Sequence, residues 1–451
     1  MVMNRHNFLA NFGLFALGLG ITARVFIFVG TMIVSDILSI LFMPFLFLRL
    51  FKEMKKEGFV IYIYMCLSLI LGLIFSSIYN GETFADLYKA VISYIGLISY
   101  FLVFYATLRN NPRGLGWFFF GYALSGIITI WFFNAAVLES QTLPGMRYFG
   151  NKTVEEVMND SLFWVGRISS IGQLPIIASY LKTPLMYSVS YPILFVIAAL
   201  LLTISGRGQS ASILISGALI SLCGKSRRKM LRIKRHFVLM LIVVLVAVIS
   251  YKFCYSYLAS HGVLGADAQA KYEGQTARGT DAISVLLSSR AYVFMGLYAA
   301  IHHPLVGFGS NNIDKEDFSL QYAMKYGVDE DVRNQVFFNA QALKYGYMRR
   351  IPTHSHIIGA WVSCGLIGLV FFIWYLVLLF KHVMNYLAVV PQWFGYFAIS
   401  VPSILFSIFF SPMRSRWDIA LFAFCALYAR AIARGRIVLP YDMEKEARKY
   451  E

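Results

Sequence analysis

Charged residues are scarce in this chain of 451 residues, and acidic residues are scarcer than basic ones. Only 14% of the residues are charged, whereas 58% are hydrophobic and the mean hydropathy is +0.64. A water-facing shell cannot cover so much apolar surface, which excludes an ordinary soluble domain. The composition therefore predicts an all-α polytopic protein whose solvent is the lipid bilayer.

Cysteine is also rare, with five residues that all fall in or beside apolar runs. None of them forms a C-x-x-C pair, so the sequence indicates neither a disulfide framework nor a thiolate metal site. The excess of Lys and Arg gives a formal net charge of +17. Polytopic membrane proteins carry such an excess on their cytoplasmic loops, and we therefore expect no nucleic-acid partner.

Apolar runs long enough to cross about 30 Å of hydrocarbon recur along the whole chain. We count twelve, near residues 8–23, 27–48, 59–78, 87–107, 115–137, 164–181, 186–205, 209–223, 237–257, 355–380, 390–410 and 417–433. The first run follows a short basic lead without a cleavage site, so we expect a membrane helix and not a removed signal peptide.

Basic residues follow the even-numbered runs, as in KSRRKMLRIKRH at 225–236. Because Lys and Arg collect on the cytoplasmic side, both termini are predicted to be cytoplasmic. The chain then divides into nine helices over 1–257, an outer loop over 258–354, three helices over 355–433 and a cytoplasmic tail over 434–451. The outer loop is far longer than a usual connection, and its middle has the apolar spacing of an amphipathic helix on the membrane face.

A charge inside a bilayer costs about 2.5–3.5 kcal/mol on insertion scales, so each charge inside or at the edge of the bilayer needs a reason. The outer-side candidates are Arg207 between the seventh and eighth runs, Arg290, His354 and His356, Arg167, and Arg414 with Arg416. Each also has a plain interpretation: Arg207 as a snorkelling interface residue, Arg290 as part of the polar face of an interfacial helix, and the histidines as solvated loop residues.

Metal ligands are suggested only weakly. His354 and His356 form an H-x-H pair, and acidic runs occur at 314–317 and 329–331. No further ligand is fixed beside the histidines, and short acidic runs are usually solvated turns, so we expect no metal and no other cofactor.

The predicted topology places Arg207, Arg290 and His356 on one side of the membrane, at or beside helix ends. Two guanidiniums match a diphosphate, and an imidazole can accept a proton from an attacking hydroxyl. This combination favours a reaction whose leaving group is a lipid-linked pyrophosphate.

Three stretches resemble the O-antigen ligase and Wzy-type polysaccharide polymerase family: ISGRGQSASIL (204–214), SSRAYVFMGLYAAIHHPLVGFGSNN (288–312) and HSHIIGAWVSCGLIGLVFF (354–372). The family shows an Arg step between two helices, an Arg-led helix that ends in Pro and Gly-x-Gly, and a His that opens the next helix. The resemblance covers roughly residues 200–375, together with the twelve-helix frame and the single large outer loop.

The resemblance implies an inverting, metal-independent membrane glycosyltransferase of the GT-C type in a bacterial inner membrane, with a periplasmic active site. Its donor would be an undecaprenyl-diphosphate-linked oligosaccharide, and a chain-length regulator is a further expected partner. Arg207 and Arg290 match the diphosphate-binding arginines, and His356 matches the histidine that activates the acceptor. Arg167 is carried over as a glycan or phosphate contact, and His354 remains an alternative base.

Two functions of this family remain open, with the polymerase favoured. A polymerase transfers the glycan to a second lipid-linked repeat unit, and an O-antigen ligase transfers it to a lipid A core sugar. A transporter or lipid-glycan flippase is a further alternative, but it predicts charges near the bilayer midplane and a repeat between two halves. The sequence places its notable charges at outer helix ends instead.

Overall fold

The computed structural model describes residues 5–21, 24–27, 30–132, 290–326, 350–389 and 416–438, with short pieces within 257–273 and 404–410. These residues are mostly helical. In chain order the elements are α1 (Arg5–Leu19), β1 (Arg24–Ile27), β2 (Gly30–Ile33), α2 (Val34–Glu57), α3 (Val60–Tyr79), α4 (Phe84–Leu108), η1 (Pro112–Gly114), α5 (Leu115–Phe132), α16 (Ala291–His302), α17 (Phe318–Tyr326), α19 (His356–Cys364), α20 (Leu366–Val389) and α22 (Trp417–Ala433).

Within the described ranges, four helical stretches are long and apolar enough to cross a membrane: Val34–Glu57, Val60–Tyr79, Ala90–Leu108 and Leu366–Val383. The predicted mostly helical membrane protein is thereby confirmed. The predicted runs at 164–181, 186–205, 209–223 and 237–257 lie outside the described residues, so the count of twelve stays a prediction.

The run predicted at 27–48 does not begin as a helix. Residues 24–33 form an antiparallel hairpin in which Arg24 pairs with Ile33 and Ile27 with Gly30. Five of the eight strand residues are β-branched or aromatic, and such residues favour extended backbone. The helix α2 then begins at Val34 and continues to Glu57, beyond the predicted end. The purely helical architecture expected from hydropathy is therefore interrupted by one short hairpin.

The run predicted at 355–380 is divided into two helices, α19 and α20, at Gly365. Gly365 has φ +63°, and a Cβ there would lie 2.1 Å from the carbonyl oxygen of Leu305. Only glycine adopts this backbone without strain and admits so close a neighbour. The apolar stretch that can cross a membrane thus begins after α19, at Leu366.

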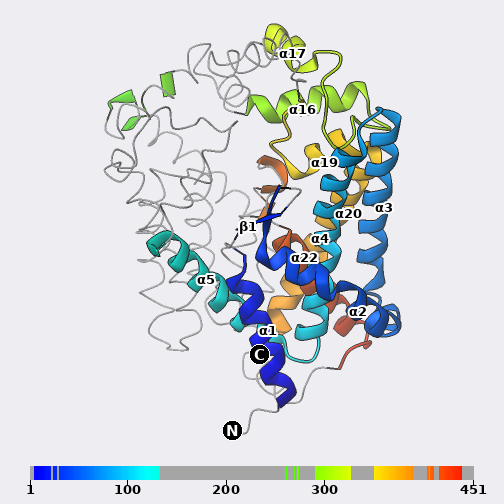
Figure 1. Cartoon of the computed structure of the whole chain (residues 1–451), viewed down its shortest axis with the longest axis vertical. Coiled ribbons are helices and arrows are strands. Elements are labelled where there is room, and N and C mark those ends of the chain that lie inside the picture. Colours follow the sequence, from blue (N-terminus) through cyan, green and yellow to red (C-terminus); the bar gives the residue numbers. More distant parts are fainter. Residues whose placement is uncertain are drawn as a thin grey trace.

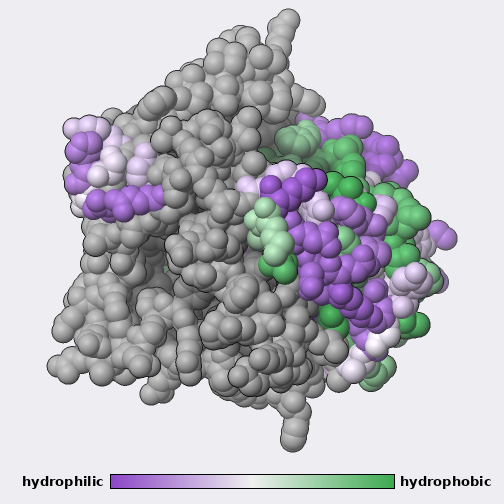
Figure 2. Space-filling model, turned by 90° about the horizontal axis from the view of Figure 1, so that it is seen from above, coloured by the Kyte–Doolittle hydropathy of each residue, from purple (hydrophilic) through white to green (hydrophobic). Residues whose placement is uncertain are grey.

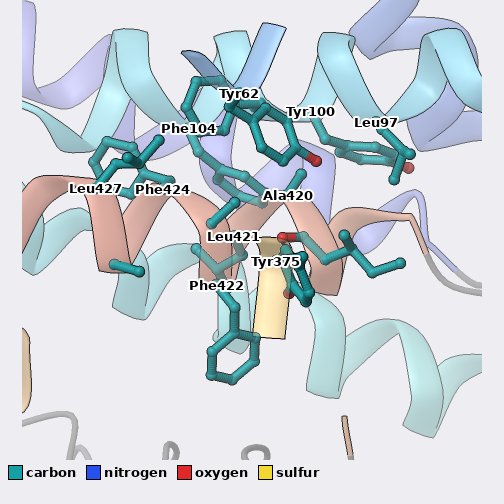
Figure 3. Close-up of a cluster of buried hydrophobic side chains, with 14 of the residues drawn as sticks. Tyr62, Leu97, Tyr100, Phe104, Tyr375, Ala420, Leu421, Phe422, Phe424 and Leu427 are labelled. Atoms are coloured by element: carbon teal, nitrogen blue, oxygen red, sulfur yellow. Dashed lines mark hydrogen bonds between the residues drawn. The ribbon is translucent and has the colours of Figure 1, made fainter. Parts of the chain in front are cut away.

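The helix α22 lies in the centre of the described helices, and every residue from Ile419 to Ala429 is buried. A helix that is apolar on all sides is expected to be enclosed by other elements. The ring centroid of Phe424 lies 6.5 Å from that of Phe101 in α4, whereas Phe422 points to the other side of α22 in Figure 3. Small residues recur along α22 and let its neighbours approach closely, which stabilises helix packing in lipid: Ala420, Ala423, Ala426 and Ala429.

The helices α16 and α17 lie across one end of the long helices α3, α4 and α20, and α1 begins near the other end (Figure 1). Figure 2 shows the α16 and α17 end from above, where hydrophilic residues gather and hydrophobic residues border them. The residues predicted to carry chemistry and described by the structure belong to this end.

Candidate functional site

The helices α16 and α19 pack side by side and run in the same direction. At their beginnings the ring of Tyr292 stacks on His354, with centroids 4.7 Å apart. At their ends the indole N–H of Trp361 donates to the carbonyl oxygen of Pro304 at 3.0 Å. The two helix N-termini therefore lie at the same side of the pair, and the predicted site residues Arg290, His354 and His356 come with them.

His356 occupies the first position of α19 and is only 3% exposed. Ser355 caps the helix, because its hydroxyl accepts a hydrogen bond from the N–H of Ile358 at 3.2 Å. The same hydroxyl donates to the carbonyl oxygen of Ile408 at 2.8 Å. The imidazole lies 6.1 Å from the ring of Phe372 in α20. These contacts give the buried imidazole a fixed place at the helix N-terminus.

Arg290 is the N-cap residue of α16 and makes no side-chain capping bond. Its guanidinium lies 5.4 Å from the ring centroid of Phe410, within cation–π range. Phe410 follows Ile408 by two residues, so one short segment contacts both Arg290 and the cap of α19. A guanidinium and the positive end of a helix both attract anions. The arrangement therefore favours a negatively charged ligand.

His354 differs from His356 in its surroundings, because His354 is exposed whereas His356 is buried. His356 begins α19, and His354 precedes it by two residues. A further polar group, the hydroxyl of Tyr322, lies on α17 where it packs against α16. Burial raises the pKa of Tyr322 to about 12, with a smaller contribution from Tyr326. This hydroxyl therefore stays protonated at neutral pH and does not compete as a proton acceptor.

Three predicted candidates, Arg207, Arg167 and Arg414, lie outside the described residues, as does the acidic run at 329–331. In the acidic run at 314–317, Asp314 is buried and caps α17 by accepting from the N–H groups of Phe318 and Ser319 at 2.8 and 2.9 Å. Among the residues that the structure describes, no group of three or more His, Cys, Asp or Glu could hold a metal ion. Asp314 thus has a structural role.

Gly307 and Gly365 lie next to each other in the structure. They belong to the second and third of the stretches that resemble the family, 288–312 and 354–372. Gly307 has φ +77°, and a Cβ there would lie 2.6 Å from the backbone nitrogen of Gly365. The N–H of Phe308 donates to the carbonyl oxygen of Val362 at 2.6 Å. This contact joins the loop after α16 to the end of α19 and keeps the two helices parallel.

Glu82, in the loop between α3 and α4, is a site-supporting residue that the sequence did not reveal. Its carboxylate accepts hydrogen bonds from the N–H groups of Ser310 and Asn311, both at 2.7 Å, and from the Ser310 hydroxyl at 2.5 Å. Asn80 adds a bond from its amide to the carbonyl oxygen of Gly307 at 3.1 Å. These contacts fasten the loop after α16 to the ends of the membrane helices.

Arg416, a predicted candidate at a helix end, is the N-cap residue of α22. Its guanidinium forms a salt bridge with Asp36 and donates to the hydroxyl of Ser93 at 3.0 Å. Tyr100 donates to the other oxygen of Asp36 at 2.7 Å. Residues 93–100 belong to the apolar stretch Ala90–Leu108, so the ion pair is enclosed among membrane helices. The sequence contains a signal for this ion pair, because Asp36 is the lone charged residue of the run at 27–48.

No protein-family model matches this chain, and no curated protein matches it either. The described helices define a mostly helical membrane protein in which an arginine and two histidines meet at two helix N-termini. The resemblance to the O-antigen ligase and Wzy-type family rests on the three sequence stretches.

Proposed function

We propose that this protein is a membrane glycosyltransferase that polymerises a polysaccharide from an undecaprenyl-diphosphate-linked oligosaccharide. One observation carries the proposal: the parallel packing of α16 and α19 brings Arg290, His354 and His356 to adjoining helix N-termini. The described residues at the opposite end of the helices are strongly basic, which supports a cytoplasmic location there and a periplasmic site at the α16 end of an inner-membrane protein.

The leaving group suits this site because it is an anion whose negative charge grows as the glycosidic bond breaks. The first N–H groups of a helix have no acceptor within the helix and attract phosphate oxygens. Arg290 adds a planar guanidinium that binds two phosphate oxygens at once. Arg207 is the proposed second arginine, and Arg167 a proposed glycan or phosphate contact.

The transfer step requires a base near the anomeric carbon of the donor. A hydroxyl oxygen of the acceptor forms a bond to that carbon, and the bond from the carbon to the diphosphate oxygen breaks. The hydroxyl proton moves to the imidazole of His356, and undecaprenyl diphosphate leaves with the bonding electrons. Attack opposite the leaving group inverts the anomeric configuration. Burial of His356 keeps water away from the proton acceptor, which favours transfer to the sugar over hydrolysis.

A strain that lacks the gene and carries variants tests this proposal. We expect that Arg207→Ala, Arg290→Ala and His356→Ala each abolish long-chain glycan while the protein stays in the membrane. His302→Ala is the matched control, because His302 is exposed at the far end of α16. Full activity in two of the three variants would overturn the assignment.

The glycan profile of the deletion strain also separates the two acceptors. A single repeat unit on lipid A core means that the missing activity is the polymerase. Polymer that accumulates only on undecaprenyl diphosphate means that the missing activity is the ligase and contradicts the proposed acceptor. A comparison of His354→Ala with His356→Ala identifies the base, and loss of activity only in the former would reassign that role to His354.

A further inference from the structure

A polar pocket lies at the end of the molecule opposite α16. It has a volume of about 280 Å³ and is lined by Glu57, Arg109, Asn110, Arg436, Ile437 and Val438. The end of α2, the residues after α4 and the residues after α22 meet there. The guanidinium of Arg436 lies so near Gly58 that a Cβ on this glycine would be 2.6 Å from it. The pocket is thus formed by three segments that are distant in the sequence.

The basic residues around this pocket outnumber the acidic ones. Both glutamates at the end of α2, Glu53 and Glu57, form salt bridges with Arg109. Burial acts to lower the pKa of Arg109, but the hydrogen bond to Glu57 and the negative charges of Glu57 and Glu53 raise it overall. The guanidinium therefore stays charged, and its charge is already balanced by these carboxylates.

Arg436 of the pocket and other basic side chains at the ends of α2 and α22 lack an acidic partner among the residues that the structure describes. Arg434 and Arg436 are exposed and close enough to Arg430 to repel it electrostatically. Lys52 and Lys55 are exposed on the last turns of α2. None of these five forms an ion pair with a residue in the described part of the chain. Like charges held together in this way attract an anion.

An exposed apolar stripe on α2 leads to the same place. Leu41, Phe45 and Leu48 are 70%, 60% and 82% exposed. Their spacing of three and four residues places them on one helix face, and Lys52 and Lys55 continue that face at its end. At the pocket rim the side chain of Val438 is 87% exposed. Apolar surface and unbalanced positive charge therefore adjoin each other.

We propose that this pocket and the adjoining face of α2 bind an anionic phospholipid of the leaflet at that end. The phosphate contacts the guanidiniums of Arg434 and Arg436, and an acyl chain lies along the stripe of Leu41, Phe45 and Leu48. A soluble phosphate compound would use the cations but leave the stripe uncovered. Basic pockets between membrane helices suit anionic headgroups for the same reason.

Native mass spectrometry of the purified full chain in detergent tests the proposal, with phosphatidylglycerol and phosphatidylcholine of equal chain length as probes. We expect phosphatidylglycerol to bind at least about tenfold more tightly than phosphatidylcholine. Removal of two charges in Arg434→Gln/Arg436→Gln is expected to weaken phosphatidylglycerol binding about thirtyfold. Lys381→Gln is the matched control, because Lys381 is an exposed basic residue on α20 outside the pocket.

Two further results separate a lipid from other occupants. Leu48→Ser should weaken phosphatidylglycerol binding several-fold, although no charge changes, because the acyl chain loses a contact. Inorganic phosphate at a concentration equal to the lipid should not displace phosphatidylglycerol. Equal binding of both lipids, equal effects of the double variant and Lys381→Gln, or displacement by phosphate would each overturn the proposal.

Discussion

Glu82 shows how a single side chain outside the proposed catalytic residues holds the candidate site together. Its carboxylate accepts three hydrogen bonds from Ser310 and Asn311, in the loop that follows α16. Hydrogen bonds to a charged acceptor are stronger than those between neutral groups, and their donors are backbone and hydroxyl groups that would otherwise need other partners. The loop position therefore depends on this residue.

Glu82→Ala is expected to lower the free energy of unfolding by about 1–3 kcal/mol, because three hydrogen bonds to the carboxylate are lost. The measurement is thermal unfolding of the purified protein in detergent. Glu316→Ala is the control, since the side chain of Glu316 pairs with His303 and is 55% exposed, and such surface pairs contribute about 0–1 kcal/mol. Equal effects of the two substitutions would contradict the role of Glu82.

The sequence predicted Arg290, His354 and His356 as site residues because charges beside apolar runs are rare and costly. Glu82 gave no such signal, since a lone glutamate in a short outer loop is usually solvated. Its partners are backbone N–H groups more than two hundred residues away, and no residue pattern marks them. Contacts of this kind require the tertiary structure.

At the scale of elements, the break between α19 and α20 determines where the site lies. Gly365 ends α19 and lets the loop at Leu305 approach its backbone. The helix α19 can then lie beside α16 while α20 continues as a membrane helix. An unbroken helix over the predicted run 355–380 would not allow residues 356–364 to pack beside α16 in this way.

Gly365→Ala is therefore expected to destabilise the protein by at least about 1–3 kcal/mol, the usual cost of such a backbone conformation in a residue with a Cβ. The clash with the Leu305 carbonyl adds to this cost. Gly13→Ala in α1 is the matched control, because a Cβ there meets nothing within 4 Å. We expect the control to stabilise α1 by about 1 kcal/mol. A lower unfolding temperature for the control than for Gly365→Ala would refute this explanation.

Hydropathy predicted the helices α3, α4 and α22 nearly to their ends, because each fills one uninterrupted apolar run. It did not predict the hairpin at 24–33, since a short run of β-branched and aromatic residues is equally apolar as strand or helix. The break at Gly365 was also missed. A lone glycine in an apolar run does not disclose a positive φ, which depends on the neighbouring loop.

For the whole molecule, the ion pair of Asp36 and Arg416 connects α2, α4 and α22. Asp36 is 3% exposed, and Tyr100 and Ser93 of α4 bond to the two partners. In lipid a lone charge is costly, so each partner of the pair depends on the other. The pair fixes the start of α22, which packs in the centre of the described helices.

Asp36→Asn is expected to destabilise the protein by about 3–5 kcal/mol, because it leaves Arg416 charged and unbalanced among membrane helices. The double variant Asp36→Leu/Arg416→Met should recover most of this loss, since it removes both charges and keeps apolar volume. Thermal unfolding of both proteins in detergent measures the difference. A double variant that is less stable than Asp36→Asn would contradict a purely paired role.

Glycosyl transfer by the purified protein tests the central claim most directly. The measurement is the rate at which an undecaprenyl-diphosphate-linked oligosaccharide is converted to longer glycan and free undecaprenyl diphosphate. We expect the unmodified chain to catalyse this transfer, and Arg290→Ala and His356→Ala each to slow it at least about 100-fold. Arg350→Ala, at an exposed position, should retain the full rate. Absence of transfer by the unmodified chain, or full rates in both site variants, would contradict the account.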